Sequence, residues 1–357
     1  MPKRKDSAAG GGKFRTVIPK GYKSALDLRE TERAIKRIKD LFQTNLAEAM
    51  NLARVSAPLI VLKGTGVNDY LSGKEIPVRF HIDDMGESGE IVQSLAKWKR
   101  KALGEYSFQP GEGLYTDMNA IRPHERLDNL HSLYVDQWDW EKVMRTEERH
   151  LEFLKETVRT IYRIVKEKET EICGIYPSLM EPFLPDGIFF VHSEELQKRY
   201  PRLSPREREN RICKDKGAVF VIGIGGTLGD GKPHDERASD YDDWVSENPG
   251  GTRGLNGDIL VWYPLLGTAF ELSSMGIRVD KTALLRQLKL KGEMHKTGWD
   301  YHRSLIRGQL PQTIGGGIGQ SRLCMLYLRK AHVGEVQAGI WPDAVLRRCR
   351  KNSVALL

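Results

Sequence analysis

Four short runs of strand-forming residues follow one another in the second half of the chain, and this succession strongly constrains the fold. They are AVFVIGIGG (218–226), GDILVWYP (257–264), AFELSSMGIRV (269–279) and QTIGGGIG (312–319). Helical patterns near 281–292 and 299–307 interrupt the runs, and another covers 320–330. Because helices do not alternate one-for-one with the strands, the order predicts a mostly antiparallel sheet with helices on its faces, an α+β domain.

The first half of the chain predicts further elements of the same domain. Apolar residues recur at helical spacing from Leu28 to about Leu52, which predicts a long amphipathic helix. The next run, VSAPLIVL (55–62), predicts a strand, and Pro58 within it indicates an edge or interface strand, since proline cannot donate to a ladder. The other expected elements are a strand then a loop in 78–98, a strand at 130–140, and helices at 147–172 and from Pro205, after the cap Ser204, to Gly217.

The positive charge of the chain is concentrated at its N-terminus. The net charge is +8, but residues 1–25 hold seven Lys or Arg against one Asp, so the remaining chain is nearly neutral. The overall charge is therefore no argument for nucleic-acid binding. Residues 1–24 are rich in Gly and Lys and lack apolar periodicity, which predicts a disordered basic tail before a single folded domain, 25–357. At most, we expect this tail to bind polyanions weakly.

Composition also limits which cell compartment and which metal sites we expect. No apolar run approaches the ~20 residues that a membrane helix needs. The four cysteines show no CxxC spacing and nothing resembles a signal peptide, so we expect reduced thiols in a cytoplasmic protein. The nine histidines form no HxxxH or HExxH pair, which gives little support to a metal site built on imidazole.

The stretch GTLGDGK (226–232) has the outline of a phosphate-binding P-loop. The next residue should be Ser or Thr and should open a helix, but Pro233 and His234 follow. We therefore predict a hairpin-like turn.

Two acidic stretches and one glycine-rich stretch are candidates for a site. SDYDDW (239–244) alone would be a solvated acidic loop. In VDQWDW (135–140), strand alternation puts Gln137 and Asp139 opposite the two tryptophans, as expected if the polar side lines a cavity. Glu271 lies between apolar neighbours on a strand, so it requires a cation. In GGGIGQSRL (315–323), a strand without side chains would let a flat ligand lie on its backbone, and Arg322 follows as the first cation.

Three of these stretches together resemble the motifs of class II aminoacyl-tRNA synthetases. ARVSAPLIV (53–61) resembles the first, dimer-forming motif, IRPHE (121–125) with HSLYVDQWDWE (131–141) the second, and GGGIGQSRL the third. Over roughly residues 25–357 the chain is more similar to the bacterial-type ammonia-dependent asparagine synthetases, or aspartate-ammonia ligases. The stretches that carry this resemblance, in order, include NDYLSG, QSLAKWKR, GEGLYTDMNAIRP, SDYDDW, GLNGDILVW and FELSSMGIRVD.

The resemblance implies a class II catalytic domain that binds a bent ATP on an antiparallel sheet. It implies that the β-carboxylate of L-aspartate attacks the α-phosphate of ATP, giving a β-aspartyl-adenylate and pyrophosphate, and that ammonia then displaces AMP. Both steps need stabilisation of charge more than acid or base chemistry. A homodimer is also implied.

The resemblance assigns roles residue by residue. Arg122 and Arg322 match the arginines of the second and third motifs, which would hold the α-phosphate and a substrate anion. Mg²⁺ would be bound by Asp258 and Glu271. The residues that would hold aspartate are Asp69, Gln137 and Asp242, with Ser94, Asp139, Ser273 and Ser274 beside them. Lys99 and Arg278 would contact the phosphates. Other nucleotide contacts would be His131, Ser132, Val135, Leu272, Gly315, Gly316 and Gly317.

Two alternatives come from other classes of protein. An aspartyl- or asparaginyl-tRNA synthetase would need about 100 further residues for an anticodon-binding domain. The expected catalytic domain takes up residues 25–357 and leaves only the short tail for it. A catalytically silent paralogue would be expected to have lost an arginine or a metal-binding carboxylate, and all four are present. An N-terminal glutaminase would need a cysteine where Pro2 stands. The sequence therefore favours the ligase.

Overall fold

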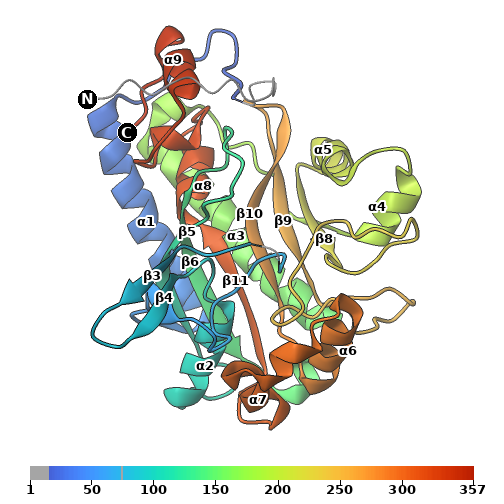
Figure 1. The fold of residues 1–357 in the computed structure, drawn as a ribbon. Coiled ribbons are helices and arrows are strands. Elements are labelled where there is room, and N and C mark those ends of the chain that lie inside the picture. The colour runs from blue at the N-terminus through green and yellow to red at the C-terminus, as the bar shows by residue number, and fades with distance from the viewer. Residues whose placement is uncertain (1–15, 74) are drawn as a thin grey trace.

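The computed structural model describes residues 16–73 and 75–357. Its centre is an eight-stranded sheet with the order β1-β5-β6-β11-β10-β9-β8-β7 (Figure 1). The strands are β1 (Leu52–Arg54), β5 (Gly113–Ile121), β6 (Tyr134–Val143), β7 (Phe189–His192), β8 (Ala218–Ile222), β9 (Asn256–Tyr263), β10 (Thr268–Ile277) and β11 (Thr313–Gly319). Only the two edge pairs, β1 with β5 and β7 with β8, are parallel. The predicted mostly antiparallel α+β architecture is confirmed.

Helices cover the sheet at positions that were largely predicted. They are α1 (Leu28–Met50), α2 (Ala96–Glu105), α3 (Leu151–Ile175), α4 (Ser193–Arg199), α5 (Pro205–Lys216), α6 (Lys281–Lys291), α7 (Asp300–Ile306), α8 (Gln320–Tyr327) and α9 (Asp343–Lys351). Helix α1 begins at a capping box in which Asp27 and Glu30 satisfy each other's backbone N–H groups. It ends at Asn51, whose left-handed conformation (φ 56°) stops the helix.

The main core lies between the sheet and the helices α1, α3 and α8. Trp138 and Trp140 of β6 are fully buried there, and the ring of Phe42 from α1 lies 4.8 Å from that of Trp138. Figure 1 shows α1 and α3 running along the sheet on this side. Because the tryptophans occupy one face of β6, its alternate residues are presented on the opposite face, away from this helical layer.

The segment 55–105 differs from the prediction. VSAPLIVL is not one strand: Pro58 lies in a connection between β1 and the short β2 (Ile60–Leu62). Strand β2 belongs to a separate small sheet, β2-β4-β3, with β3 (Arg79–Ile82) and β4 (Glu87–Ile91). The expected strand is β3, but β4 occupies part of the expected loop, and helix α2 begins at its end and was not predicted, because its buried Lys97, Lys99 and Arg100 hide the apolar period that identifies a helix.

The packed chain begins before residue 25. The backbone N–H of Val17 donates to Asn129 Oδ1 at 2.8 Å, and the Tyr22 hydroxyl donates to Glu335 Oε2 at 2.9 Å. The part of the expected disordered tail in residues 16–24 therefore packs against the domain, whereas residues 1–15 lie outside the described residues.

Several smaller expectations can be compared directly. GTLGDGK forms a hairpin-like turn with a Thr227–Pro233 bridge, as predicted, and no helix begins directly after this turn. The four cysteines are buried and free. Within the part of the chain that the structure describes, no helix is both long and apolar enough to cross a bilayer.

Candidate active site

A polar cavity of about 320 Å³ contacts strands β6, β10 and β11, helix α2 and the loop 235–242. Sixteen of the residues singled out from the sequence line it: Ser94, Lys99, Arg122, His131, Ser132, Val135, Gln137, Asp139, Asp242, Glu271, Leu272, Ser274, Arg278, Gly316, Gly317 and Arg322. The other four, Asp69, Asp258, Ser273 and Gly315, are buried around it. The structure therefore gathers residues from distant parts of the sequence into one site.

Strand β6 supplies polar groups by simple alternation. Gln137 and Asp139 line the cavity while Trp138 and Trp140 fill the core behind them, as predicted.

Strand β10 needs an irregularity to do the same. Glu271 and Ser274 both line the cavity although they are three positions apart, a spacing that puts two side chains on opposite faces of a regular strand. The pairing with β9 shifts between Glu271 and Ser273, so Leu272 is the extra residue of a β-bulge. The bulge brings Glu271 and Ser274 to the same cavity.

The glycines of β11 make room for the protein's own polar side chains. A Cβ atom on Gly315 would collide with the carboxylate of Glu141 and lie 2.7 Å from Arg278 Nη2. A Cβ atom on Gly317 would lie 2.7 Å from Asp139 Oδ1 and would collide with Gln137 Oε1. The glycine run thus lets the β6 side chains lie flat over β11. Its contact with a nucleotide stays a prediction.

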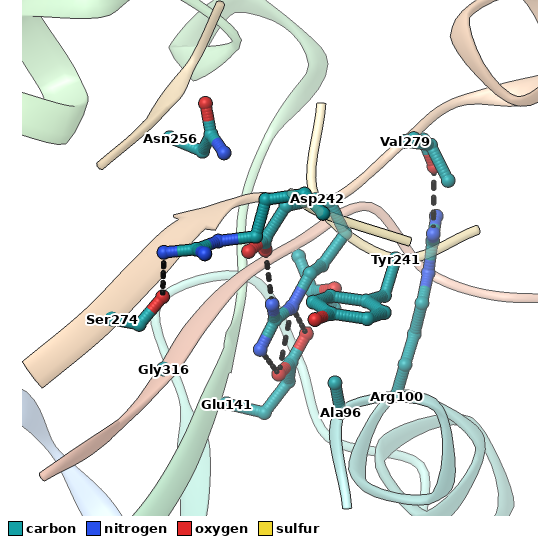
Figure 2. Close-up of polar contacts among 12 residues, drawn as sticks. Ala96, Arg100, Glu141, Tyr241, Asp242, Asn256, Ser274, Val279 and Gly316 are labelled. Atoms are coloured by element: carbon teal, nitrogen blue, oxygen red, sulfur yellow. Dashed lines mark hydrogen bonds and ion pairs between the residues drawn. The ribbon is translucent and has the colours of Figure 1, made fainter. Parts of the chain in front are cut away.

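An ionic cluster forms one part of the wall. Arg278 donates to Glu141 Oε2 at 2.8 Å and also to Asp242 Oδ1, and these contacts are the dashed lines that end on Glu141 and Asp242 in Figure 2. Lys99 Nζ lies 3.1 Å from Asp139 Oδ1 and donates to the carbonyl of Gly316. Burial disfavours the charge of Glu141, but Arg278 holds its pKa below the usual range.

The stretch SDYDDW is not a solvated loop. Asp240, Asp242 and Asp243 are all buried. Asp240 accepts from Lys97 at 3.1 Å, and Asp243 pairs with Arg149. Each carboxylate is therefore compensated by a cation from another element, which the sequence alone could not reveal.

Arg122 and Arg322 both face the cavity. Arg322 Nη1 donates to the carbonyl of Glu271 at 3.0 Å and lies 3.4 Å from its carboxylate. Arg122 Nε is buried and has no hydrogen-bond partner among the described residues. Burial, with the nearby charge of Arg322, lowers the pKa of Arg122. A buried donor on a cavity wall favours an anionic ligand.

The two expected metal-binding carboxylates are both held by arginines. Asp258 on β9 accepts from Arg237, and Glu271 on β10 lies against Arg322. The described residues contain no group of three or more His, Cys, Asp or Glu arranged for a metal ion. Two carboxylates still fit Mg²⁺, which usually takes one or two protein carboxylates together with substrate phosphates. Burial raises the pKa of Asp258, with the charge of Glu271 adding to the effect and Arg237 opposing it.

Asp69 is fully buried beside the cavity. Its Oδ2 accepts from the backbone N–H of Ala96 at 2.7 Å, and its Oδ1, which has no hydrogen-bond partner in the described chain, is 3.7 Å from Lys97 Nζ. Burial raises the pKa of Asp69 to about 6.

Sequence reasoning missed several residues of the cavity wall, including an arginine and a glutamine whose polar contacts shape it. Arg237 comes from the loop after the hairpin-like turn, and the residues around it in the sequence do not indicate that it belongs to a site. Gln337 comes from beyond the last predicted helix, and its amide connects Ser132, Asp136 and Ser321. Both belong to the site only through tertiary contacts.

Comparison with known proteins agrees with this geometry. The family model for aspartate-ammonia ligase matches residues 29–353. An aspartate–ammonia ligase of Clostridium perfringens is 57% identical over 341 residues, which are 95% of this chain and 98% of that protein. One from Bacteroides fragilis is 54% identical and covers 96% and 99% of the two chains. The chain belongs to the aspartate-ammonia ligase family. Its resemblance to that family is thereby confirmed.

Solved structures show that this chain has the fold of the class II synthetases. The asparaginyl-tRNA synthetase of Pyrococcus horikoshii complexed with asparaginyl-adenylate superposes with a TM-score of 0.63 at 17% identity, over 88% of this chain and 70% of that one. The asparaginyl-tRNA synthetase of Entamoeba histolytica gives 0.61 at 15% identity, over 87% and 67%. At this identity the likeness establishes the fold, and the predicted class II architecture is confirmed.

Proposed function

We propose that the protein makes L-asparagine from L-aspartate, ammonia and ATP and releases AMP and pyrophosphate. Its membership of the aspartate-ammonia ligase family supports the overall reaction. The observation that carries the assignment of the site is the convergence of Arg122, Arg322, Glu271 and the polar face of β6 on one cavity.

In the first step, an oxygen of the aspartate β-carboxylate forms a bond to the α-phosphorus, and the bond from that phosphorus to the β-phosphate oxygen breaks. Arg122 has the unsatisfied donor that the developing charge on the α-phosphate would use. Arg322 lies on the same wall and would hold the activated carboxylate. Asp258 and Glu271 would hold Mg²⁺, which neutralises phosphate charge when it is bound.

In the second step, the ammonia nitrogen forms a bond to the β-carbonyl carbon, the bond to the AMP oxygen breaks, and the nitrogen loses a proton. Asp69, Gln137 and Asp242, with Ser94, Asp139, Ser273 and Ser274 around them, would keep the aspartyl part in place. Lys99 and Arg278 lie among the carboxylates of this wall, where they would meet anionic groups of the substrates.

The adenine end of the cavity is proposed to include His131, Ser132, Val135 and Leu272, beside Gly315, Gly316 and Gly317. Gln337 donates to Ser321 Oγ at 3.1 Å and contacts Ser132, so it would fix the shape of this end. The buried free thiols fit work in the reducing cytoplasm.

The test is to incubate the protein with ATP, MgCl₂ and aspartate, with and without ammonium chloride, and to identify all products. We expect asparagine, AMP and pyrophosphate in equal amounts, and no asparagine without ammonium. Stoichiometric ADP and phosphate would exclude adenylation. Formation of AMP with transfer of aspartate or asparagine to added tRNA would instead favour a tRNA synthetase.

A further inference from the structure

Arg237 has a position that the proposed mechanism does not use. Its Nη2 atom donates to both carboxylate oxygens of Asp258, at 2.7 and 2.6 Å, and lies 3.4 Å from Ser274 Oγ, the contact drawn at Ser274 in Figure 2. Its Nη1 atom donates to Asp235 Oδ2 at 2.8 Å. One guanidinium thus connects a deeply placed carboxylate to a surface carboxylate.

The two carboxylates differ in their exposure. The side chain of Asp258 is 8% exposed and that of Asp235 is 63% exposed, while Arg237 itself is 12% exposed. A carboxylate buried like Asp258 requires a compensating cation, and the guanidinium supplies it through both oxygens. A divalent cation needs the same oxygens, so the guanidinium and the metal would compete for them.

The surroundings of Arg237 allow its side chain to leave Asp258. It lines the cavity in which nucleotide phosphates are proposed to bind. Its second contact, to the exposed Asp235, does not depend on Asp258. It lies on a connection between β8 and β9, outside any helix or strand, where a change of side-chain position need not disturb the sheet.

We propose that Arg237 is an exchangeable internal cation: it neutralises Asp258 until a divalent cation takes that carboxylate, and it then turns to the incoming phosphates. The inference rests on the proposed assignment of Asp258 to the metal. Charge remains balanced in the exchange, because the cation brings positive charge to Asp258 while the phosphates bring negative charge to the released guanidinium. The exchange makes tight metal binding depend on nucleotide.

The test measures Mn²⁺ binding to the full-length protein without nucleotide, from the electron paramagnetic resonance signal of free Mn²⁺. Unaltered protein should bind Mn²⁺ weakly at this site. Arg237→Gln should bind it ~10-fold more tightly or better, because the variant leaves a buried carboxylate without its cation. The double variant Arg237→Gln with Asp258→Asn should lose that gain.

Arg253→Gln is the matched control, since it removes an arginine from an exposed ion pair with Glu247. It should leave Mn²⁺ binding unchanged. Equal affinity of the unaltered protein and a folded Arg237→Gln variant would overturn the inference while leaving the products of the enzyme assay, and so the proposed function, untouched.

A second measurement needs no variant. In a crystal structure of the unaltered protein with MnCl₂ and a non-hydrolysable ATP analogue, we expect the metal on Asp258 and the guanidinium of Arg237 more than 4 Å from that carboxylate. A metal elsewhere, with both Arg237 hydrogen bonds to Asp258 intact, would refute the exchange.

Discussion

Asp69 is a carboxylate whose charge costs folding free energy. Its pKa is raised to about 6 by burial, so the folded protein binds more protons than the unfolded chain between the ordinary pKa of Asp and pH 6. Stability should therefore fall as pH rises through this window, by on the order of 3 kcal/mol. We predict that Asp69→Asn raises the melting temperature at both pH 5 and pH 8, and more at pH 8, where the whole window has been crossed, as measured by calorimetry.

Asp240 provides the contrast for this experiment. Although burial opposes its ionisation, Lys97, His302 and Lys296 hold its pKa well below the usual range. Asp240→Asn should therefore destabilise the protein at both pH values. If Asp69→Asn lowered the melting temperature at pH 8, burial would not be the dominant effect on that carboxylate. Activity should be lost in Asp69→Asn if the residue holds the substrate ammonium.

Gly317 is a position where one methyl group should disturb the site. Because an added Cβ would collide with Gln137 and crowd Asp139, Gly317→Ala must displace the side chains proposed to hold aspartate. We predict that kcat/KM for aspartate falls ~10-fold or more, since misplaced positioning groups are costly. Steady-state kinetics measures this loss. Gly174→Ala, where a Cβ meets nothing within 4 Å, should behave like the unaltered enzyme.

At the scale of elements, residues 16–24 act as a strap on the domain. Tyr22 donates to the buried Glu335, and such a hydrogen bond to a charged group contributes ~1.5–3 kcal/mol. Tyr22→Phe should lower the free energy of unfolding by about this amount, as measured by urea denaturation. The exposed Tyr106→Phe is the control. An unchanged midpoint for Tyr22→Phe would show that this hydrogen bond adds nothing to stability.

The elements also show where sequence reasoning succeeds. The β6 alternation was predictable because Trp138 and Trp140 are apolar and their neighbours are not, so the pattern alone separates the two faces. Helix α2 was not, because three of its buried residues are cationic and find partners far away, such as the carbonyl of Pro311 for Arg100 and Asp240 for Lys97. The same reason hid Arg237: its role follows from the position of Asp258, not from the residues beside it in the chain.

At the scale of the whole molecule, the small sheet presents apolar side chains to solvent. Ile60 of β2 and Phe80 of β3 lie over Gly89 of the middle strand β4, and they are 44% and 38% exposed. Leu59, Ile76 and Met85 nearby are also exposed. This surface follows β1, the region that resembles a dimer-forming motif, so we propose that it is buried between two copies of the chain.

The homodimer can be tested by light scattering at micromolar concentration. For the unaltered protein we predict twice the chain mass of 40.6 kDa. The double variant Ile60→Asp with Phe80→Asp should shift toward the mass of a single chain, because two buried charges oppose association. Met180→Asp places the same charge on an apolar residue that is 81% exposed and far along the chain, and it should leave the mass unchanged. A monomeric unaltered protein would refute the proposal.

The bulge in β10 has a consequence for how this strand can evolve. Glu271 and Ser274 reach the same cavity because Leu272 is one residue more than the pairing with β9 requires. If the bulge were straightened without the loss of a residue, Glu271 and Ser274 would face opposite sides of the sheet, and one of them would leave the cavity. Natural variants should therefore keep the bulge together with the extra residue, or lose both together, since either change alone separates Glu271 from Ser274.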